Sequence, residues 1–470
     1  MNTAVATWER ICDHPDLSLI PPPFRSQVLR DAGVALLDRY KVRGASSDLE
    51  RSIAAFEQAA AGTSIGSLQR ADYLTALAAG LQARWSRTNE LVDLRRAAAL
   101  LEEALALTAD GSADLLMRLD NLRIVLRDLY KHTGDVADLQ LEVEIAELAV
   151  NQTPSGSPEM LERRATLASV LSDRHQHIGD ISDLRRAIEL NSEVVRETAP
   201  EASEWSRRSN NLAATLWQYY AETGELASLD QAVQILEDVL ANLPLASADR
   251  ALQLSNLGEA LNNRFDQRRD PDDLHRVVDL AEAALAQTPV GSPERAERLG
   301  KWGIRLLDLY QATEEPGTLD RAAEAVEAAL TAMPPDSPDR SQALSYVSLV
   351  LFYRYQASAV PADLDRAIEL AEGAVENAPA ASLTQAGELN NLARALVVRY
   401  DRAGELADLT KAVRAFRESC ERAVDVGARE GVGIASSWGH WAAGRGEWQE
   451  AAEAFGYALR AMNRVSGRRS

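Results

Sequence analysis

Apolar residues recur along this chain with a fixed period. Nine leucines stand at every 45th position, with no insertion or deletion between the first and the last. We call them the anchor leucines: Leu49, Leu94, Leu139, Leu184, Leu229, Leu274, Leu319, Leu364 and Leu409. A constant period of this size is typical of supersecondary units that stack on their neighbours. The pattern therefore predicts a solenoid, an architecture that usually serves as a binding surface.

The residues after each anchor leucine predict a helix. Small or apolar side chains fall 3, 4, 7, 10 and 11 positions later, on one face of an α-helix, as in residues 367–375. Asp, Ser or Thr directly precedes every anchor, and these residues are good N-caps. We therefore expect this helix to begin at the anchor. In five repeats a proline at one fixed register marks its end: Pro154, Pro244, Pro289, Pro334 and Pro379.

Another helix is expected before each anchor. Serine N-caps recur at one register in seven repeats: Ser67, Ser112, Ser157, Ser247, Ser292, Ser337 and Ser382. A leucine that recurs in every repeat, first at Leu36, and a ring side chain four residues after it form an apolar stripe. The helix is expected to stop at residues that tolerate the left-handed conformation: Gly44, Asn89, Gly134, Gly179, Gly224 and Gly404. Each repeat is therefore a helical hairpin.

These hairpins resemble the tetratricopeptide repeat (TPR). A small residue at the register of Gly33 (Arg123 is the exception), a leucine three residues later and an alanine-rich second helix are similar to its two helices. The short TPR spacing itself is reproduced near the end by Trp438, Gly439, Gly446, Trp448, Ala451, Phe455 and Ala458. The nine longer units resemble the extended TPRs found upstream of caspase-like CHAT protease domains. The resemblance implies an all-α, right-handed α-solenoid of antiparallel helical hairpins.

We expect three segments. Residues 1–22 lack the repeat pattern and are expected to cap the first hairpin, with Trp8 as the apolar contact. Residues 23–430 hold the nine repeats, and residues 431–470 form a terminal short TPR hairpin with a basic tail. The stretch after Leu409 is too short to hold a CHAT domain, so a protease would have to be a separate chain.

Composition narrows the function classes. A net charge of −21 argues against a nucleic-acid partner, which needs a basic face for its phosphates. The two cysteines, Cys12 and Cys420, form neither a disulfide framework nor a zinc motif, which fits a reducing compartment. The sequence has no secretory signal and no apolar run long enough to span a membrane. We therefore expect a cytoplasmic protein without a membrane partner.

Candidate catalytic groups are few. Cys12 and His14 could supply half of a metal site, but no second pair of ligands has matching spacing. His175 takes the ring position of its repeat, where a packed core histidine is the simpler interpretation than an acid–base pair with His177. The sequence lacks a phosphate-binding loop, a nucleophile elbow and an HExxH motif. We expect no enzyme activity, no cofactor and no metal.

Candidate binding residues lie on the first helices of the hairpins. In TPR superhelices these helices line the concave groove, and some members hold a peptide backbone there with an asparagine ladder. That resemblance points to one register on these helices and to neighbouring amides: Asn121, Asn211, Asn256 and Asn391, with Asn210, Asn262 and Asn390. An amide both donates and accepts, so it can pair with any peptide backbone. The alternative is that these amides tie adjacent repeats together.

Aromatic and basic residues add two further candidates. Trp217, Phe352 and Tyr353 lie outside the inferred core stripe and could be exposed anchors for a partner. The alternative is that residues 345–356 form a helix buried on all sides. Basic residues also recur at two registers, in series that begin at Arg39 and at Arg51. They could follow an acidic partner, although ion pairs with the many carboxylates explain them more simply.

These features predict a non-catalytic scaffold that binds a protein or peptide partner along the concave face of a TPR superhelix. Two other functions stay open. The chain could be a regulatory subunit of a separately encoded CHAT-type protease, or an oligomeric scaffold that self-associates. An enzyme with a site inside the superhelix is the least favoured alternative.

Overall fold

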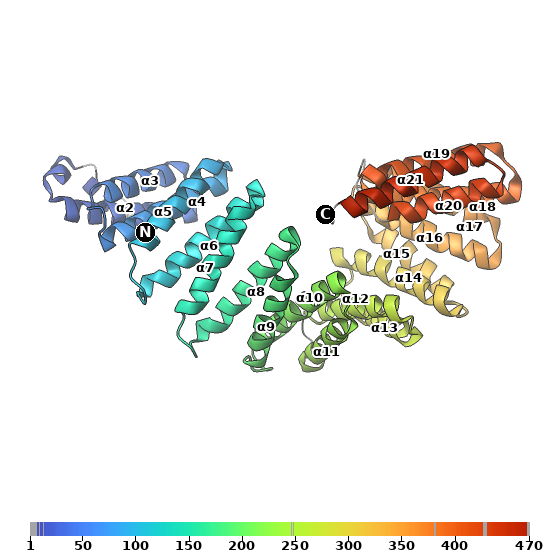
Figure 1. The fold of residues 1–470 in the computed structure, drawn as a ribbon, viewed down its shortest axis with the longest axis horizontal. Coiled ribbons are helices and arrows are strands. Elements are labelled where there is room, and N and C mark those ends of the chain that lie inside the picture. Colours follow the sequence, from blue (N-terminus) through green and yellow to red (C-terminus); the bar gives the residue numbers. More distant parts are fainter. Residues whose placement is uncertain are drawn as a thin grey trace. The chain divides into compact units, whose positions relative to one another are not determined.

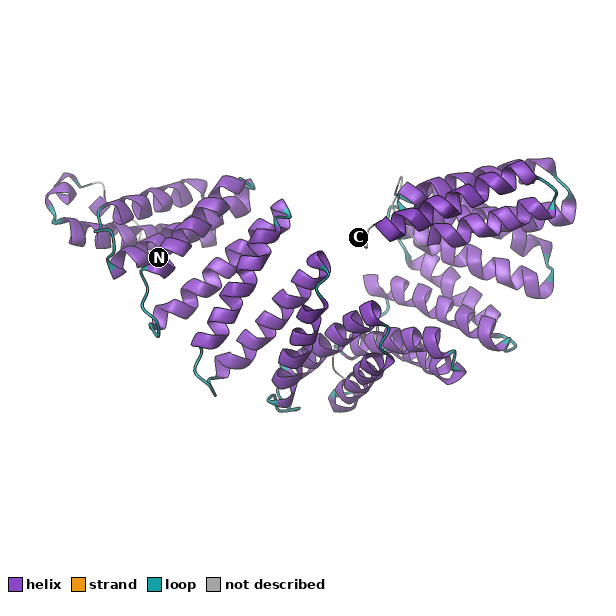
Figure 2. Ribbon diagram, viewed as in Figure 1, coloured by secondary structure: helices purple, strands orange, loops and turns teal. Residues whose placement is uncertain are grey.

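The computed structural model describes residues 7–8, 10–12, 14–245, 247, 249–379, 382–425 and 430–467. Within these ranges every regular element is a helix and no strand occurs (Figure 2). The chain divides into two compact units, residues 1–235 and residues 236–470, with the boundary inside one helix. The fold is an all-α repeat solenoid, which confirms the predicted fold class.

Helices follow one another along the whole described chain (Figure 1). In the first unit they are η1 (Pro15–Leu19), α2 (Pro22–Arg43), α3 (Ser46–Ala61), α4 (Leu68–Thr88), α5 (Leu91–Ala106), α6 (Ala113–Thr133), α7 (Val136–Gln152), α8 (Pro158–Ile178), α9 (Ile181–Arg196), α10 (Trp205–Thr223) and part of α11 (Leu226–Asn242). The second unit continues with α12 (Arg250–Arg268), α13 (Pro271–Ala286), α14 (Pro293–Thr313), α15 (Thr318–Ala332), α16 (Arg340–Ser358), α17 (Pro361–Asn377), α18 (Leu383–Ala403), α19 (Leu406–Asp425), α20 (Glu430–Gly444) and α21 (Trp448–Gly467).

The even-numbered helices are the first helices of the hairpins, and we call them A helices; the odd-numbered ones are B helices. An A helix packs on the B helix that follows it, as α4 packs on α5. That B helix packs in turn on the next A helix, as α5 packs on α6. Within each unit, hairpins therefore bury their apolar stripes against their neighbours, as expected of stacked repeats.

The sequence correctly predicts both ends of the A helices. Most of the expected serine caps accept a hydrogen bond from a backbone amide of the first turn: Ser67, Ser112, Ser157, Ser292 and Ser382. All of the expected stop residues have left-handed backbone: Gly44, Asn89, Gly134, Gly179, Gly224 and Gly404. Arg269, Glu314 and Ala359 adopt the same conformation at the equivalent positions, which costs more for a residue with a Cβ atom.

The B helices begin earlier than predicted. Most of them start three residues before the anchor leucine, and α15 starts one residue before it. The residue directly before the anchor therefore lies inside the first turn and is not the N-cap. The caps lie further upstream, where for example Asp135 and Asp180 each accept a hydrogen bond from the amide two residues later. A carboxylate is favourable throughout the first turn, so its presence does not identify the cap.

An arginine on the A helix holds the aspartate that precedes the anchor. Arg84 donates from Nε to Asp93 Oδ2 at 2.8 Å and from Nη2 to Oδ1 at 2.7 Å, and Asp93 is only 2% exposed. The same bidentate ion pair recurs in five other hairpins: Arg39–Asp48, Arg174–Asp183, Arg264–Asp273, Arg354–Asp363 and Arg399–Asp408. This geometry matches the planar guanidinium. It confirms ion pairing for the basic series that begins at Arg39.

Small residues allow the A and B helices to approach closely. A Cβ atom on Gly33 would lie 2.5 Å from the ring of Phe56, so only glycine fits there. Arg123, the exception at this position, faces Glu142 of α7, with 3.5 Å between Nη1 and Oε1. Burial raises the pKa of Glu142, although Arg127 donates to it at 2.8 Å. An ion pair thus replaces the small-residue contact in this hairpin.

The two ends of the chain also carry apolar contacts. Cys12 and Leu17 pack against the core cluster of the first hairpins, while Trp8 is half-buried. In the terminal hairpin, Trp438 is fully buried and stacks on Phe416 with ring centroids 6.3 Å apart. Residues 426–429 and the last three residues of the basic tail lie outside the described residues. No helix of the described chain is both long enough and apolar enough to cross a membrane.

Candidate functional site

The basic residues two positions after the anchor are engaged within the chain. Arg96 lies 2.7 Å from Glu57 on the preceding B helix, and Lys411 lies 2.8 Å from Glu372 in the same way. Arg276–Glu237 and Arg321–Glu282 join neighbouring B helices in the same way, whereas Arg186–Glu189 and Arg366–Glu369 each lie within one helix. These exposed pairs contribute little stability, but they compensate the charge of the series. The pairs therefore confirm the simpler interpretation of the periodic basic residues.

The predicted asparagines fall into two groups. Asn262 of α12 accepts from Arg305 of α14 at 2.9 Å, and Asn391 of α18 donates to Ser345 of α16 at 3.3 Å. These two therefore tie adjacent A helices, as in the alternative interpretation. The others make no side-chain hydrogen bond with any described residue: Asn121, Asn210, Asn211, Asn256 and Asn390. Asn211 is exposed and the other four are half-buried.

A polar recess of about 180 Å³ opens between A helices α8 and α10 of the first unit. Its lining consists of Ala165, Ser169, Ser172, Asp173, Gln176, Asn191, Asn211, Ala214, Thr215 and Gln218. We call it the amide recess, because amide side chains are prominent in its lining. Gln218 Oε1 is buried and accepts no hydrogen bond from the described residues. The one charged group, Asp173, is paired with Arg127 at 2.9 Å.

Two residues that sequence reasoning missed form the buried wall of the amide recess. Asn191 of α9 donates to Thr215 Oγ1 at 3.1 Å, and Thr215 donates to the carbonyl of Asn211 at 2.8 Å. Asn191 is 4% exposed and Thr215 is 5% exposed. The signal was present in the repeat pattern. The position of Asn191, seven residues after the anchor, is apolar in every other repeat: Phe56, Leu101, Ala146, Leu236, Ala281, Val326, Ala371 and Phe416.

The three predicted aromatic anchors differ in their exposure to solvent. Trp217 of α10 is 43% exposed and lies one residue before Gln218 of the amide recess. Phe352 is 5% exposed and belongs to the core of the second unit, so the prediction of an exposed anchor was wrong there. The guanidinium of Arg394 covers its ring at 5.3 Å. Tyr353 is half-buried and packs against the same core.

The candidate catalytic groups are in structural contacts. His175 is 6% exposed, and its Nδ1 lies 2.9 Å from the carbonyl of Asp180, as expected of a packed core histidine. His177 packs edge-on against Tyr130. Among the residues that the structure describes, no three His, Cys, Asp or Glu side chains are grouped to hold a metal ion. No disulfide joins Cys12 and Cys420, and burial raises the pKa of Cys420 to about 12.

Comparisons with known proteins concern the fold. No protein-family model and no curated protein matches the chain. Among solved structures, it is similar to the TPR-like repeats of a putative kinesin light chain from Podosopora anserina, with 19% identity, 46% of this chain and 96% of the other covered, and a TM-score of 0.34. It is also similar to the C-terminal part of a TPR repeat-containing protein from Cytophaga hutchinsonii. The identity is 12%, the match covers 65% of this chain and 99% of the other, and the TM-score is 0.39.

A third similar structure is the APC/C hetero-tetramer Cut9–Hcn1, with 12% identity, coverage of 98% of this chain and 92% of the other, and a TM-score of 0.38. At these identities and TM-scores, the likeness carries no information about a partner.

Proposed function

We propose that the chain is a non-catalytic scaffold that binds a protein or peptide partner through the face formed by its A helices. The observation that carries this proposal is the amide recess between α8 and α10. Side chains of the two periodic basic series, such as Arg84, Arg96 and Lys411, have carboxylate partners within the chain. The amides of Asn211, Gln176 and Gln218 have no such partner among the described residues. Asn211 and Gln176 are exposed, so a partner could reach their amides, whereas Oε1 of Gln218 is buried.

Unpaired amides suit a peptide backbone better than a charged ligand. Each carries donors and an acceptor, so it can bond to a peptide carbonyl and a peptide N–H at once. Trp217, exposed on the same helix, would add an apolar contact of the kind that dominates interface energies. The proposed mechanism is therefore capture of an extended backbone in the recess, with Trp217 as a side-chain anchor.

The identity of the partner, self-association and the location in the cell are further parts of the proposal. The extended TPR resemblance favours a separately encoded CHAT-type protease as the partner, which would make the chain a regulatory subunit. Self-association is the second option, since an A-helix face can also receive another copy of the chain. The absence of a disulfide between Cys12 and Cys420 is compatible with the proposed cytoplasmic location.

The experiment compares capture from native lysate by the wild-type chain and by the variant Asn211→Ala/Gln218→Ala, followed by mass spectrometry. The expected result is a partner that the wild type retains and the variant loses, confirmed with the purified partner. Asn377→Ala is the matched control, because that exposed amide bonds only to the carbonyl of Gly373 in its own helix. Equal capture by all three proteins would refute the assignment of the recess.

A further inference from the structure

The last helix, α21, exposes an apolar face. One side of α21 packs on α20 and α19 (Figure 1). On another side four large apolar side chains are between 36% and 71% exposed: Trp448, Phe455, Leu459 and Met462. No other helix of the described chain exposes more than two large apolar side chains. A patch of this kind on a folded protein marks a contact surface.

The exposed side chains form a single stripe along α21. Trp448, Ala452, Phe455, Leu459 and Met462 are spaced alternately by four and three residues, and we call them the α21 stripe. This is the spacing of the residues that meet between paired helices in a coiled coil. Neither the stripe nor the residue after each of its large members Trp448, Phe455 and Met462 carries a charge. The stripe is therefore suited to pack against another helix.

The same positions are buried in the preceding B helix, α19. Phe455 and Leu459 correspond to Phe416 and Cys420 of α19, because both helices carry an alanine one and four residues before the phenylalanine. Phe416 and Cys420 are buried, and they belong to one core cluster with Trp438 of α20. In α19, helix α20 thus covers the face that α21 exposes. The α21 stripe is a surface of the kind that receives a further helix.

Gly456 lies beside the stripe, in the middle of α21. A Cβ atom at this position would meet no atom of the described chain within 4 Å, so packing within the chain does not require a glycine. A glycine inside a helix is unfavourable relative to alanine. Close approach of another helix explains its presence, since a residue without a side chain lets two backbones come near each other.

The charges of α21 favour a second copy of the same helix as the occupant. The charged residues before Phe455 are acidic, Glu450 and Glu453, and those after it are basic, Arg460 and Arg464. In an antiparallel pair of α21 helices, the acidic half of one lies beside the basic half of the other. Flanking charges of this kind set the partner and the orientation of paired helices, and the helix dipoles favour the same arrangement.

We propose that two copies of the chain associate through their α21 stripes, packed antiparallel about a two-fold axis near Phe455 and Gly456. A two-fold contact brings the same patch of both copies together. The stripe is uncharged, so both copies bury it without an unpaired charge. This inference rests on the self-association named in the proposed function and assigns it to α21, a B helix.

Sedimentation velocity of the full chain over a concentration series measures the association. We expect a monomer–dimer equilibrium with a dissociation constant in the micromolar range, because one helix pair buries less area than a standard interface. Leu459→Asp should weaken the dimer by about a hundredfold or more, since the two-fold axis places a carboxylate from each copy in one apolar contact. The matched control is Leu406→Asp, at a 70% exposed leucine that begins α19, and it should leave the dimer unchanged.

Gly456→Gln separates the contact between copies from the fold of each copy. The new side chain has open space in the monomer and improves the helix propensity, so the melting temperature of the dilute protein should not fall. The dimer should weaken by about tenfold, because the helices are held apart. Arg460→Glu should also weaken it by about tenfold, since acidic halves then face each other. Arg402→Glu, at an exposed arginine of α18, controls for the added negative charge.

Circular dichroism checks that each variant is folded. A chain that stays monomeric at about 100 µM would overturn the proposal, whatever else binds to α21. A dimer that the folded Leu459→Asp and Gly456→Gln variants leave intact would also overturn it. Equal effects of Arg460→Glu and Arg402→Glu would contradict the antiparallel arrangement. Sedimentation reports only self-association, whereas the Asn211→Ala/Gln218→Ala variant is judged by partner capture, so the two proposals fail separately.

Discussion

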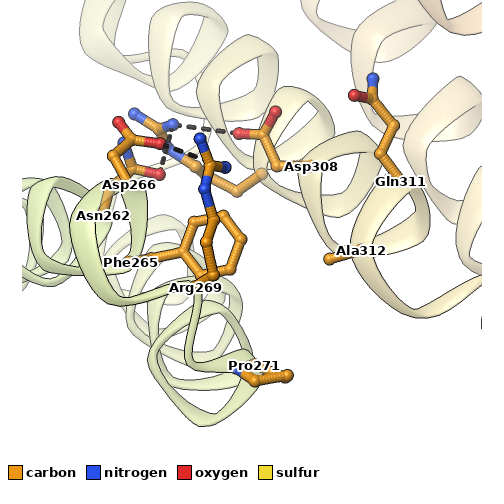
Figure 3. A pocket seen from close by; sticks show the side chains of 9 residues that line it. Asn262, Phe265, Asp266, Arg269, Pro271, Asp308, Gln311 and Ala312 are labelled. Carbon is orange, nitrogen blue, oxygen red and sulfur yellow. Dashed lines mark hydrogen bonds and ion pairs between the residues drawn. The ribbon is translucent and has the colours of Figure 1, made fainter.

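The amide recess of the first unit and a recess of about 500 Å³ in the second unit, lined by Asn262, Asp266, Arg305 and Asp308 among others (Figure 3), overlap in repeat register. In each, a polar residue takes a register at which the remaining seven repeats carry Ala, Gly or Val: Thr215 in α10 and Arg305 in α14. The consequences differ, because Thr215 is satisfied by Asn191 and Asn211, whereas Arg305 draws in carboxylates. The comparison teaches that register decides where a recess forms, while the substituted residue decides its ligand chemistry.

The largest expected change in stability concerns Glu388 of α18. Its side chain is buried and has no cationic partner among the described residues. In the first unit the equivalent residues are Val28, Tyr73, Arg118, Arg163 and Arg208. Burial raises the pKa of Glu388 from 4.5 to about 7, although hydrogen bonds from Ser345 and Asn391 oppose the shift. The folded state therefore favours the protonated acid. Below pH 4.5 the carboxyl is protonated in both the folded and the unfolded state, so it does not lower the free energy of unfolding. The destabilisation grows as the pH rises to about 7.

We predict that Glu388→Gln stabilises the chain at pH 8 by up to about 3 kcal/mol and has little effect at pH 4. Urea unfolding at a series of pH values measures the difference. Glu376→Gln, which removes an exposed carboxylate on α17, serves as the control. A stability gain for Glu388→Gln that is the same at both pH values would contradict the prediction.

The next effect distinguishes the two recesses directly. Replacing Arg305 by valine, the residue that α6, α8 and α16 carry at this register, leaves Glu259 and Asp308 without their cation. We expect a loss of about 1–3 kcal/mol, reduced from the value for a fully buried pair because both carboxylates are partly exposed. The loss should shrink at low pH, because burial raises the pKa of Asp308 and its carboxyl loses its charge there. Urea midpoints at pH 4 and pH 7 test this, and a valine variant as stable as the wild type at pH 7 would show that Arg305 is dispensable.

A smaller loss of stability is expected for substitutions in the amide recess. Thr215→Val removes the acceptor of the Asn191 amide in a buried site, and we expect a loss of about 1–2 kcal/mol. Asn191→Leu/Thr215→Val restores the apolar stripe of the other repeats, and its stability should return to within about 1 kcal/mol of the wild type. Thermal and urea unfolding of both variants provide the measurement. A double variant less stable than Thr215→Val would exclude this account.

The smallest effect on stability should accompany a large effect on binding. Asn211→Ala and Asn256→Ala remove side chains without partners among the described residues, so the free energy of unfolding should change by less than about 0.5 kcal/mol. Partner capture by the double variant should nevertheless fall. A clear drop in melting temperature with intact capture would mean that these amides are structural.

The predicted site residues were harder to place than the helices. Spacing put Asn211 and Asn262 on comparable faces of their A helices, and both line a recess. It could not show that Asn262 is already bound to Arg305, because that bond depends on the reach of a side chain from the next repeat. The burial of Phe352 was equally inaccessible, since it results from packing of neighbouring helices.

By itself, the sequence determined the local architecture: the constant repeat register, the serine caps, the left-handed stops and the leucine stripe. These features depend on residues within one or two helical turns, or on contacts that every repeat makes in the same way. Only the tertiary structure decided that the aspartate before an anchor is held by arginine, and which amides remain unpaired. Such pairings depend on distances between helices, and the same residue types at the same spacing permit several of them.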